Sequence, residues 1–225
     1  MDREKLYDNF EKIIQRVERA RLRVSEYHIV KIVAASKYAS AEEIRTVYEM
    51  GQRAFGENRV QDLQKKSEAL NDLPIEWHFI GRLQKNKINH LIDLEPFLMQ
   101  SLDSFELAAE LDKRLKTKNR TMDCLLQINS SYEESKAGVF PEKAYEEYLK
   151  IKENCSNIDL KGVMTIGAHS ENRDEIKKSF TLTYELFEKL KPHGAKICSM
   201  GMSHDFELAI ECGSNMVRIG SGFFG

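Results

Sequence analysis

Short apolar runs alternate with longer amphipathic stretches along almost the whole chain. Eight runs have the length and the β-branched or small residues typical of buried strands. They lie at 31–36, 53–56, 76–81, 97–101, 122–128, 160–166, 196–200 and 215–219. The stretches between them have apolar residues at helical spacing, at 40–50, 57–70, 84–93, 103–118, 141–154, 172–191 and 203–212. Strands that alternate with helices are typical of βαβ units, which form parallel sheets.

The number of strands favours one of the two common parallel folds. Eight strands in a chain of 225 residues predict a single (β/α)8 barrel domain spanning 1–225. The rival is a doubly wound, flavodoxin-like sheet, which normally has fewer strands and a glycine fingerprint after the first. Here the first strand ends in Ser36 and Lys37 instead of glycines, which favours the barrel. An additional amphipathic helix is predicted ahead of the first strand, within residues 1–27.

Charge and cysteine content limit the partners of the chain. The formal net charge of −2 gives no reason to expect a nucleic-acid partner. No apolar run approaches the roughly 20 residues that cross a bilayer, and the charged N-terminus lacks a signal-peptide core. The four cysteines are widely separated and have no metal-ligand spacing. We therefore expect a cytoplasmic protein with reduced thiols and no metal, membrane or nucleic-acid partner.

Lys37 is the first candidate for chemistry. In a barrel, functional residues collect where strands end and the following loops begin. Ser40 and Glu43 then predict the capped start of a helix, so Lys37 lies in a strand-to-helix loop. A lysine that directly follows a buried apolar strand would be partly desolvated, which favours the neutral amine that attacks a carbonyl. The plainer interpretation of this stretch alone is a solvated loop lysine.

The loops after the seventh and eighth strands predict an anion site. Gly201 to Ser203 lead into a predicted helix, so their N–H groups and the Ser203 hydroxyl would face an anion at a helix N-terminus. Arg218, Gly220 and Ser221 end the last strand and add a cation, a flexible backbone and a second hydroxyl. An amine nucleophile opposite a phosphate site is the constellation expected for pyridoxal 5′-phosphate (PLP) held as a Schiff base.

Several of these residues also have plainer interpretations. His78 lies on an alternating strand, where a satisfied interior histidine is more common than a catalytic one. Gly220 and Gly222 can simply shape a turn, and Arg218 can pair with a carboxylate inside the barrel mouth. Lys136 stands in a charged loop typical of solvated surface.

Seven sequence blocks together resemble the pyridoxal phosphate homeostasis protein family, whose fold is similar to the N-terminal barrel domain of alanine racemase and to that of eukaryotic ornithine decarboxylase. The blocks occur in order over nearly the whole chain. They are Lys31-Ile-Val-Ala-Ala-Ser-Lys37, Phe55-Gly-Glu-Asn58, residues 77–81 with 83–87, 127–129 with 136–138, 162–166, Ser199-Met-Gly-Met-Ser203 with Asp205, and Met216-Val-Arg-Ile-Gly220 with residues 224–225.

The resemblance implies cofactor contacts for seven residues of this chain. They are Lys37, Asn58, His78, Ser203, Arg218, Gly220 and Ser221. In that assignment Lys37 forms the Schiff base and Arg218 points at the pyridine nitrogen. Ser203, Gly220 and Ser221 hold the phosphate, and the remaining two residues line the pocket.

The chain also departs from the family pattern at two places. Arg59 stands where the family usually has tyrosine, which changes the rim of the pocket. Ser221-Gly222-Phe223 stands where Thr-Ala-Ile is usual, and Ser221 keeps the hydroxyl.

The resemblance implies a protein of PLP homeostasis that binds the cofactor and supplies it to apoenzymes. We expect a monomer or weak homodimer, and the sequence does not decide between the two. An arginine against the pyridine nitrogen tends to leave it unprotonated, which makes the ring a poor electron sink. Racemisation also needs a second acid–base group, which alanine racemase takes from a tyrosine of a further domain. Tyr38 and Tyr132 offer no obvious substitute, and the chain ends at Gly225, soon after the eighth strand. The alternative is a one-domain PLP-dependent amino-acid racemase or decarboxylase.

Overall fold

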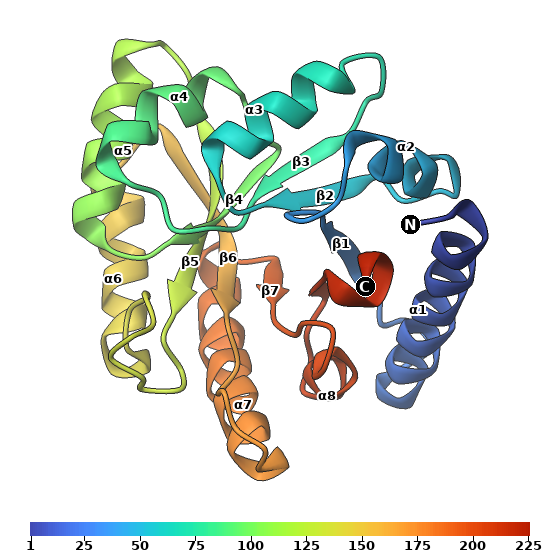
Figure 1. Ribbon diagram of the computed structural model, residues 1–225. Helices are drawn as coiled ribbons and strands as arrows, with labels where there is room; N and C mark the ends of the chain where they lie inside the picture. Colours follow the sequence, from blue (N-terminus) through green and yellow to red (C-terminus); the bar gives the residue numbers. More distant parts are fainter.

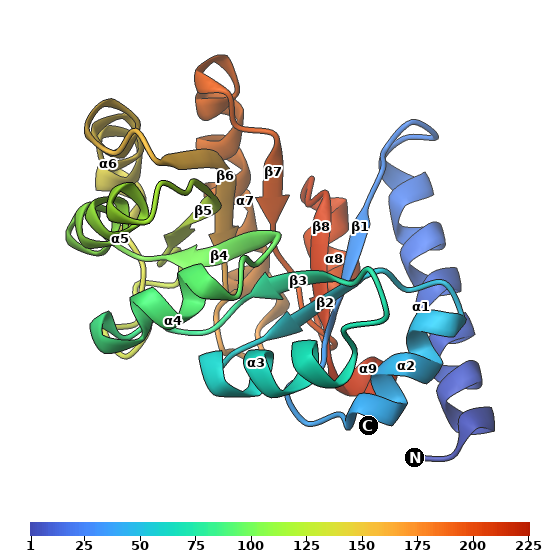
Figure 2. The same cartoon turned by 90° about the horizontal axis from the view of Figure 1, so that it is seen from above.

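The parallel strands close into a barrel in chain order, with β8 paired to β1 (Figures 1 and 2). The structure is a computed structural model that describes all residues from 1 to 225. The strands are β1 (Lys31–Ala35), β2 (Ala54–Glu57), β3 (Glu76–Phe79), β4 (Leu98–Leu102), β5 (Met122–Ile128), β6 (Ile158–Thr165), β7 (Ile197–Ser199) and β8 (Met216–Ile219). The (β/α)8 barrel predicted from the alternation of strands and helices is confirmed.

Helices cover the outside of the barrel (Figure 2). They are α1 (Arg3–Val24), α2 (Ala41–Glu49), α3 (Val60–Ala69), α4 (Ile88–Asp93), α5 (Phe105–Thr117), α6 (Pro141–Asn154), α7 (Arg173–Leu190), α8 (Phe206–Glu211) and α9 (Ser221–Phe224), with short 3-10 turns at Lys85–Lys87 and Lys191–His193. Two boundaries differ from the prediction in ways that matter for function. The helix after β7 starts three residues later than expected, at Phe206, and the short α9 after β8 was not predicted.

Helix α1 fills the gap in the outer ring beside β1 and β8. A barrel normally ends with a long helix after its last strand, but α9 has only four residues. Helix α1 packs instead against α2, α8 and α9, and Figure 1 shows it running alongside α2 and the C-terminus. Its buried face includes Ile13, while Arg16 pairs with Glu207 of α8 at 2.8 Å. The predicted N-terminal helix is therefore an integral layer of the barrel wall.

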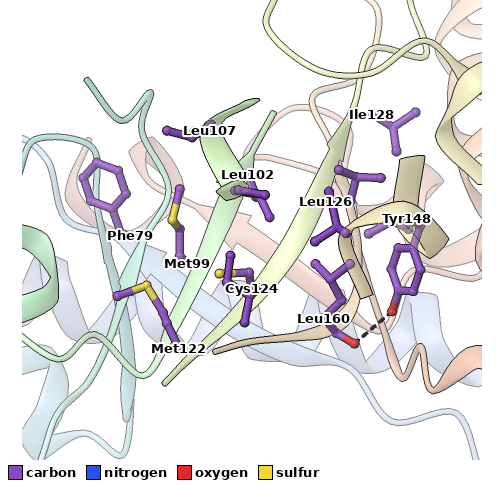
Figure 3. Close-up of a cluster of buried hydrophobic side chains, with 14 of the residues drawn as sticks. Phe79, Met99, Leu102, Leu107, Met122, Cys124, Leu126, Ile128, Tyr148 and Leu160 are labelled. Carbon is purple, nitrogen blue, oxygen red and sulfur yellow. Dashed lines mark hydrogen bonds between the residues drawn. The ribbon is translucent and has the colours of Figure 1, made fainter. Parts of the chain in front are cut away.

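The apolar core lies in two layers. The larger layer fills the space between the strands and the outer helices, and Figure 3 shows part of it between β3–β6 and α5–α6. Tyr148 of α6 is wholly buried there, and its hydroxyl donates a hydrogen bond to the Leu160 carbonyl at 2.9 Å. The smaller layer plugs the barrel interior with Val33, Ala54, Leu98, Leu125, Met164 and Met216. The interior below the mouth is thus packed, and only its upper end is open to function.

All four cysteines are free, and Cys124 and Cys198 are wholly buried among apolar side chains. None of the helices combines the length and the apolar character needed to cross a membrane. No group of three or more acidic, histidine or cysteine side chains is arranged to hold a metal ion.

Candidate cofactor site at the barrel mouth

A cavity of about 410 Å³ opens at the C-terminal ends of the strands. Three of the predicted site residues, Lys37, Asn58 and Arg218, line it together. Arg82 and Lys136 complete a set of four cationic side chains, and no carboxylate is among the lining residues. The cavity is therefore suited to an anionic ligand of small-molecule size.

Lys37 projects over this cavity because side chains alternate along a strand. Val33 and Ala35 of β1 face the barrel interior and Ser36 faces outward, so Lys37 comes back to the inner side. The expectation of a partly desolvated lysine is wrong, because β1 ends at Ala35 and Lys37 is already exposed in the loop. Its Nζ lies 4.9 Å from the centre of the Tyr38 ring, which is itself 88% exposed. The amine is thus free to reach a carbonyl that enters the cavity.

A buried ion pair supports the backbone directly behind Lys37. Glu57 is wholly buried, and its Oε1 accepts hydrogen bonds from Ser36 Oγ at 2.6 Å and from Lys66 Nζ at 2.8 Å. Lys66 also donates to the Ser36 carbonyl oxygen at 2.6 Å. Burial raises the pKa of Glu57, while its hydrogen bonds to Lys66 and Ser36 oppose that rise. Glu57 therefore faces away from the cavity and supports the end of β1.

Arg218 is a buried cation without a carboxylate partner. Its Nη1 donates to the Ser199 carbonyl at 3.0 Å and to Ser199 Oγ at 2.7 Å, and Nη2 donates to the Thr165 carbonyl at 2.7 Å. All three acceptors are neutral, so the alternative of an ion pair in the barrel mouth does not describe this structure. Burial lowers the pKa of Arg218 to about 10, an effect partly offset by the charge of Asp205, so the side chain is cationic at neutral pH.

Two of the five N–H donors of Arg218 remain for a ligand, the one on Nε and the second one on Nη2. The two terminal nitrogens are bonded to the barrel wall, whereas Nε donates to no protein atom. Nε is also not among the fully buried side-chain atoms that lack a partner, which are Glu57 Oε2 and His78 Nε2. Because Arg218 lines the cavity, its Nε–H is a donor that a bound ring nitrogen or anion could meet.

Ser203 joins the loops after β7 and β8. Its Oγ accepts hydrogen bonds from the N–H groups of Gly220 and Gly222, both at 3.2 Å. A side-chain carbon added at Gly220 would lie 3.2 Å from the Ala35 carbonyl, so this loop directly adjoins the cavity wall. Ser221 follows in the same loop and is exposed. Ser203, Gly220 and Ser221 thus gather on one side of the mouth, next to the cavity that Lys37 lines.

The predicted helix N-terminus at Ser203 is wrong. The loop after β7 makes a turn in which Asp205 Oδ1 accepts the Met202 N–H at 2.6 Å, and α8 begins only at Phe206. Gly201 permits this turn, since its φ is +95° and a Cβ there would lie 2.7 Å from the Phe206 Cα. Any anion site here depends on the Ser203 hydroxyl and the Gly220 loop rather than on α8.

Asn58 and His78 occupy different depths of the barrel. Asn58 lines the cavity, and Gly81 allows the loop after β3 to approach it, because a Cβ on Gly81 would lie 2.0 Å from the Asn58 carbonyl. His78 is wholly buried below, with its ring 5.6 Å from Phe97, which lies just before β4. Burial lowers the pKa of His78 to about 3, so it is neutral. The structure therefore does not bring His78 into the cavity that Lys37, Asn58 and Arg218 line.

Two cavity-lining cations were absent from the predicted site. Lys136 donates to Glu133 Oε1 at 2.6 Å and to the Gly167 carbonyl at 2.9 Å, which holds its side chain at the rim. Arg82 directly follows Gly81 in the loop after β3. Both stand in loops that follow strands, so the rule that located Lys37 applies to them as well.

Comparisons with known proteins agree with this geometry. The family model of the alanine racemase N-terminal domain matches residues 1–225. The pyridoxal phosphate homeostasis protein of Helicobacter pylori strain J99 is 54% identical over 212 residues, which cover 94% of this chain and 95% of that protein. The crystal structure of an unknown protein from Bifidobacterium adolescentis has a TM-score of 0.94 at 31% identity, covering 100% of this chain and 97% of that one.

A further solved structure is that of a protein with PLP bound. PipY of Synechococcus elongatus PCC7942, with PLP bound, has a TM-score of 0.80 at 31% identity, and the match covers 94% of this chain and 99% of that one. Family model, sequence relatives and solved structures all span nearly the full chain. The chain belongs to the pyridoxal phosphate homeostasis protein family, and its barrel is of the alanine racemase N-terminal type.

Proposed function

We propose that this protein binds PLP at the barrel mouth, holds it as a Schiff base on Lys37 and supplies it to apoenzymes. The observation that carries the proposal is that the free amine of Lys37 and the buried, unpaired cation of Arg218 line one cavity. A relative in the same family binds PLP, which supports this choice of ligand. We place the function in the cytoplasm, where free thiols such as those of the four cysteines persist, and in a monomer or weak homodimer.

The residues present fit each part of PLP. The cofactor would supply an aldehyde that condenses with an amine, and Lys37 provides that amine. The Arg218 Nε–H can donate to an unprotonated pyridine nitrogen. Ser203 Oγ accepts two N–H groups of the Gly220 loop, so its own proton is free for a phosphate oxygen. Asn58 provides a further polar group on the wall.

Storage and delivery suit the cavity better than turnover. A donor at the pyridine nitrogen leaves the ring a poor electron sink, which disfavours carbanion chemistry. The cavity wall has no tyrosine or carboxylate that could serve as the opposite acid–base group of a racemase. The other amine on the wall, Lys136, is paired with Glu133. We therefore propose reversible binding without sustained conversion of amino acids.

Delivery can be tested by competition with a phosphatase that destroys free PLP. The holoprotein is mixed with a PLP-dependent apoenzyme in the presence of the phosphatase, and reactivation of the apoenzyme is followed. We expect more reactivation than from the same amount of free PLP, because cofactor bound at the mouth is protected until it is handed over. Equal reactivation from both sources would contradict the delivery role.

Turnover can be tested with the same preparation. The holoprotein is incubated with each of the twenty L-amino acids, and D-isomers, keto acids and amines are measured. We expect no product above that of a Lys37→Ala control. Sustained product formation by the wild-type protein alone would favour the racemase or decarboxylase alternative.

A further inference from the structure

An unbroken chain of hydrogen bonds crosses the barrel interior from Arg218 to His78. Arg218 Nη1 lies 2.7 Å from Ser199 Oγ, and Ser199 Oγ lies 2.6 Å from Gln100 Oε1. Gln100 Nε2 lies 2.9 Å from His78 Nδ1. Arg218 is 4% exposed, and the other three residues are wholly buried. The chain thus joins four strands, β8, β7, β4 and β3, at the level just below the cavity.

The charge of Arg218 fixes the direction of every bond in this chain. A guanidinium group has donors only, so Ser199 Oγ accepts from Arg218 and must give its single proton to Gln100 Oε1. This sets the orientation of the Gln100 amide, whose NH2 group then faces His78 Nδ1 and the Met216 sulfur. His78 Nδ1 accepts, and its proton therefore lies on Nε2.

The hydrogen-bond chain ends at His78, which is buried away from water and cannot take up a second proton. His78 Nε2 is buried and has no partner, so the chain ends there. A second proton on Nδ1 of His78 would face the NH2 group of Gln100, which has no acceptor to offer. His78 is therefore held neutral, and the direction of the chain cannot reverse while Arg218 is charged.

Buried charges in proteins are usually paired with an opposite charge, but here the groups that compensate the Arg218 cation are dipoles. The Ser199 hydroxyl, the Ser199 carbonyl and the Thr165 carbonyl all present oxygen to the guanidinium. Gln100 in turn polarises the Ser199 hydroxyl through a 2.6 Å bond. The cation is thus held in place while its charge is left without a counter-ion.

We propose that Ser199 and Gln100 are positioning residues for Arg218. They hold its guanidinium against the wall so that Nε–H faces the cavity, and they keep the positive charge available to an anionic cofactor. The proposal rests on the proposed function, since the cofactor in question is PLP. It adds that two side chains that do not touch the ligand fix the orientation of the Arg218 guanidinium and leave its positive charge available.

The most direct test replaces Gln100 by Glu, which is nearly the same size but brings a carboxylate toward Ser199. We expect the affinity for PLP to fall by about tenfold or more, because the new charge neutralises Arg218. Gln52→Glu is the matched control, since Gln52 is also a buried glutamine. Its side-chain amide donates to the Ile32 and Ala54 carbonyls near the start of β2, away from the barrel mouth. The control should lose stability without a comparable loss of PLP affinity.

A second readout does not depend on the cofactor. In the protein without PLP, the Arg218 Nε–H signal in ¹H–¹⁵N NMR, identified by its absence in Arg218→Lys, should be sharp in the wild type. Ser199→Ala removes the Oγ acceptor, so this signal should broaden or shift, and Ser199→Thr, which keeps the hydroxyl, should restore it. The visible absorption band of bound PLP should shift in Ser199→Ala for the same reason.

The outcomes separate this inference from the proposed function. Wild-type affinity in Gln100→Glu, or an unchanged Arg218 signal in Ser199→Ala, would overturn the positioning role. Failure of wild-type protein to bind PLP at Lys37 would instead contradict the proposed function, while the NMR signal would still report whether Ser199 holds Arg218. Should Ser199→Ala not fold, Gln100→Glu provides both readouts.

Discussion

Lys66 donates a hydrogen bond to the Ser36 carbonyl oxygen at 2.6 Å, although the two residues are 30 positions apart. The same ammonium group pairs with the wholly buried Glu57. Helix α3 thus fixes the backbone of Ser36, the residue directly before Lys37. The amine of Lys37 is exposed, but Ser36, which precedes it, is fixed by hydrogen bonds to β2 and α3.

Replacing Lys66 by Met should destabilise the protein by about 3 kcal/mol, because it leaves the Glu57 carboxylate buried and unpaired. Urea unfolding measures this loss. Lys65→Met is the matched control, since Lys65 is the exposed neighbour on α3 and its loss should cost little. Equal stability of the two variants would show that the Lys66–Glu57 pair does not support β1.

The stability of the protein should fall below neutral pH because of His78. Its pKa is lowered to about 3 by burial, so its contribution is fully present above the unfolded pKa near 6.5 and is lost as the pH falls toward 3. Between pH 7 and pH 5 this single group should remove about 2 kcal/mol of stability. His78→Gln cannot titrate, so its unfolding free energy should change less over that interval. An identical pH dependence in both proteins would contradict a buried, neutral His78.

Ser203→Ala should weaken PLP binding by about 1–3 kcal/mol, because it removes a hydroxyl that can donate to phosphate and that organises the Gly220 and Gly222 amides. Pyridoxal, which lacks the phosphate, is the internal control and should bind both proteins equally. Affinities are measured by the change in absorbance on titration. A parallel loss for both ligands would mean that Ser203 acts on the fold rather than on the phosphate.

Ile13→Ala should destabilise the protein by about 2–4 kcal/mol, because Ile13 is 2% exposed in the core that α1 shares with α8 and α9. The side chain also lies close to Gly222, where a Cβ would be 3.2 Å from it. Ile14→Ala, at a half-buried neighbouring position, should cost less. Thermal unfolding of the two variants would reveal whether α1 is part of the barrel wall, and similar small losses would contradict it.

The fold could be predicted from the sequence almost completely, because the alternation of strands and helices is a local pattern that repeats along the chain. The ends of helices could not be predicted where a glycine or a side-chain cap decides them. At Gly201 a left-handed turn and the Asp205 carboxylate delay the start of α8, and no periodic pattern marks that event. Helix α9 is too short to show a helical period at all.

The candidate site could be predicted only in part, since side-chain partners come from distant strands. The strand-end rule placed Lys37, Asn58 and Arg218 at one mouth. It could not tell that Arg218 has no carboxylate partner, or that Ser199 reaches Gln100 across 99 residues of sequence. Strand alternation likewise gives the face of the sheet on which His78 lies but not its depth along the barrel axis.

The central claim is a Schiff base between PLP and Lys37. Borohydride reduction of the PLP-loaded protein makes such a bond permanent, and mass spectrometry of its peptides then locates the pyridoxyl group. We expect the adduct on the peptide that contains Lys37, and its loss in Lys37→Ala. An adduct on Lys136 or another lysine, or PLP binding with no adduct at all, would contradict it.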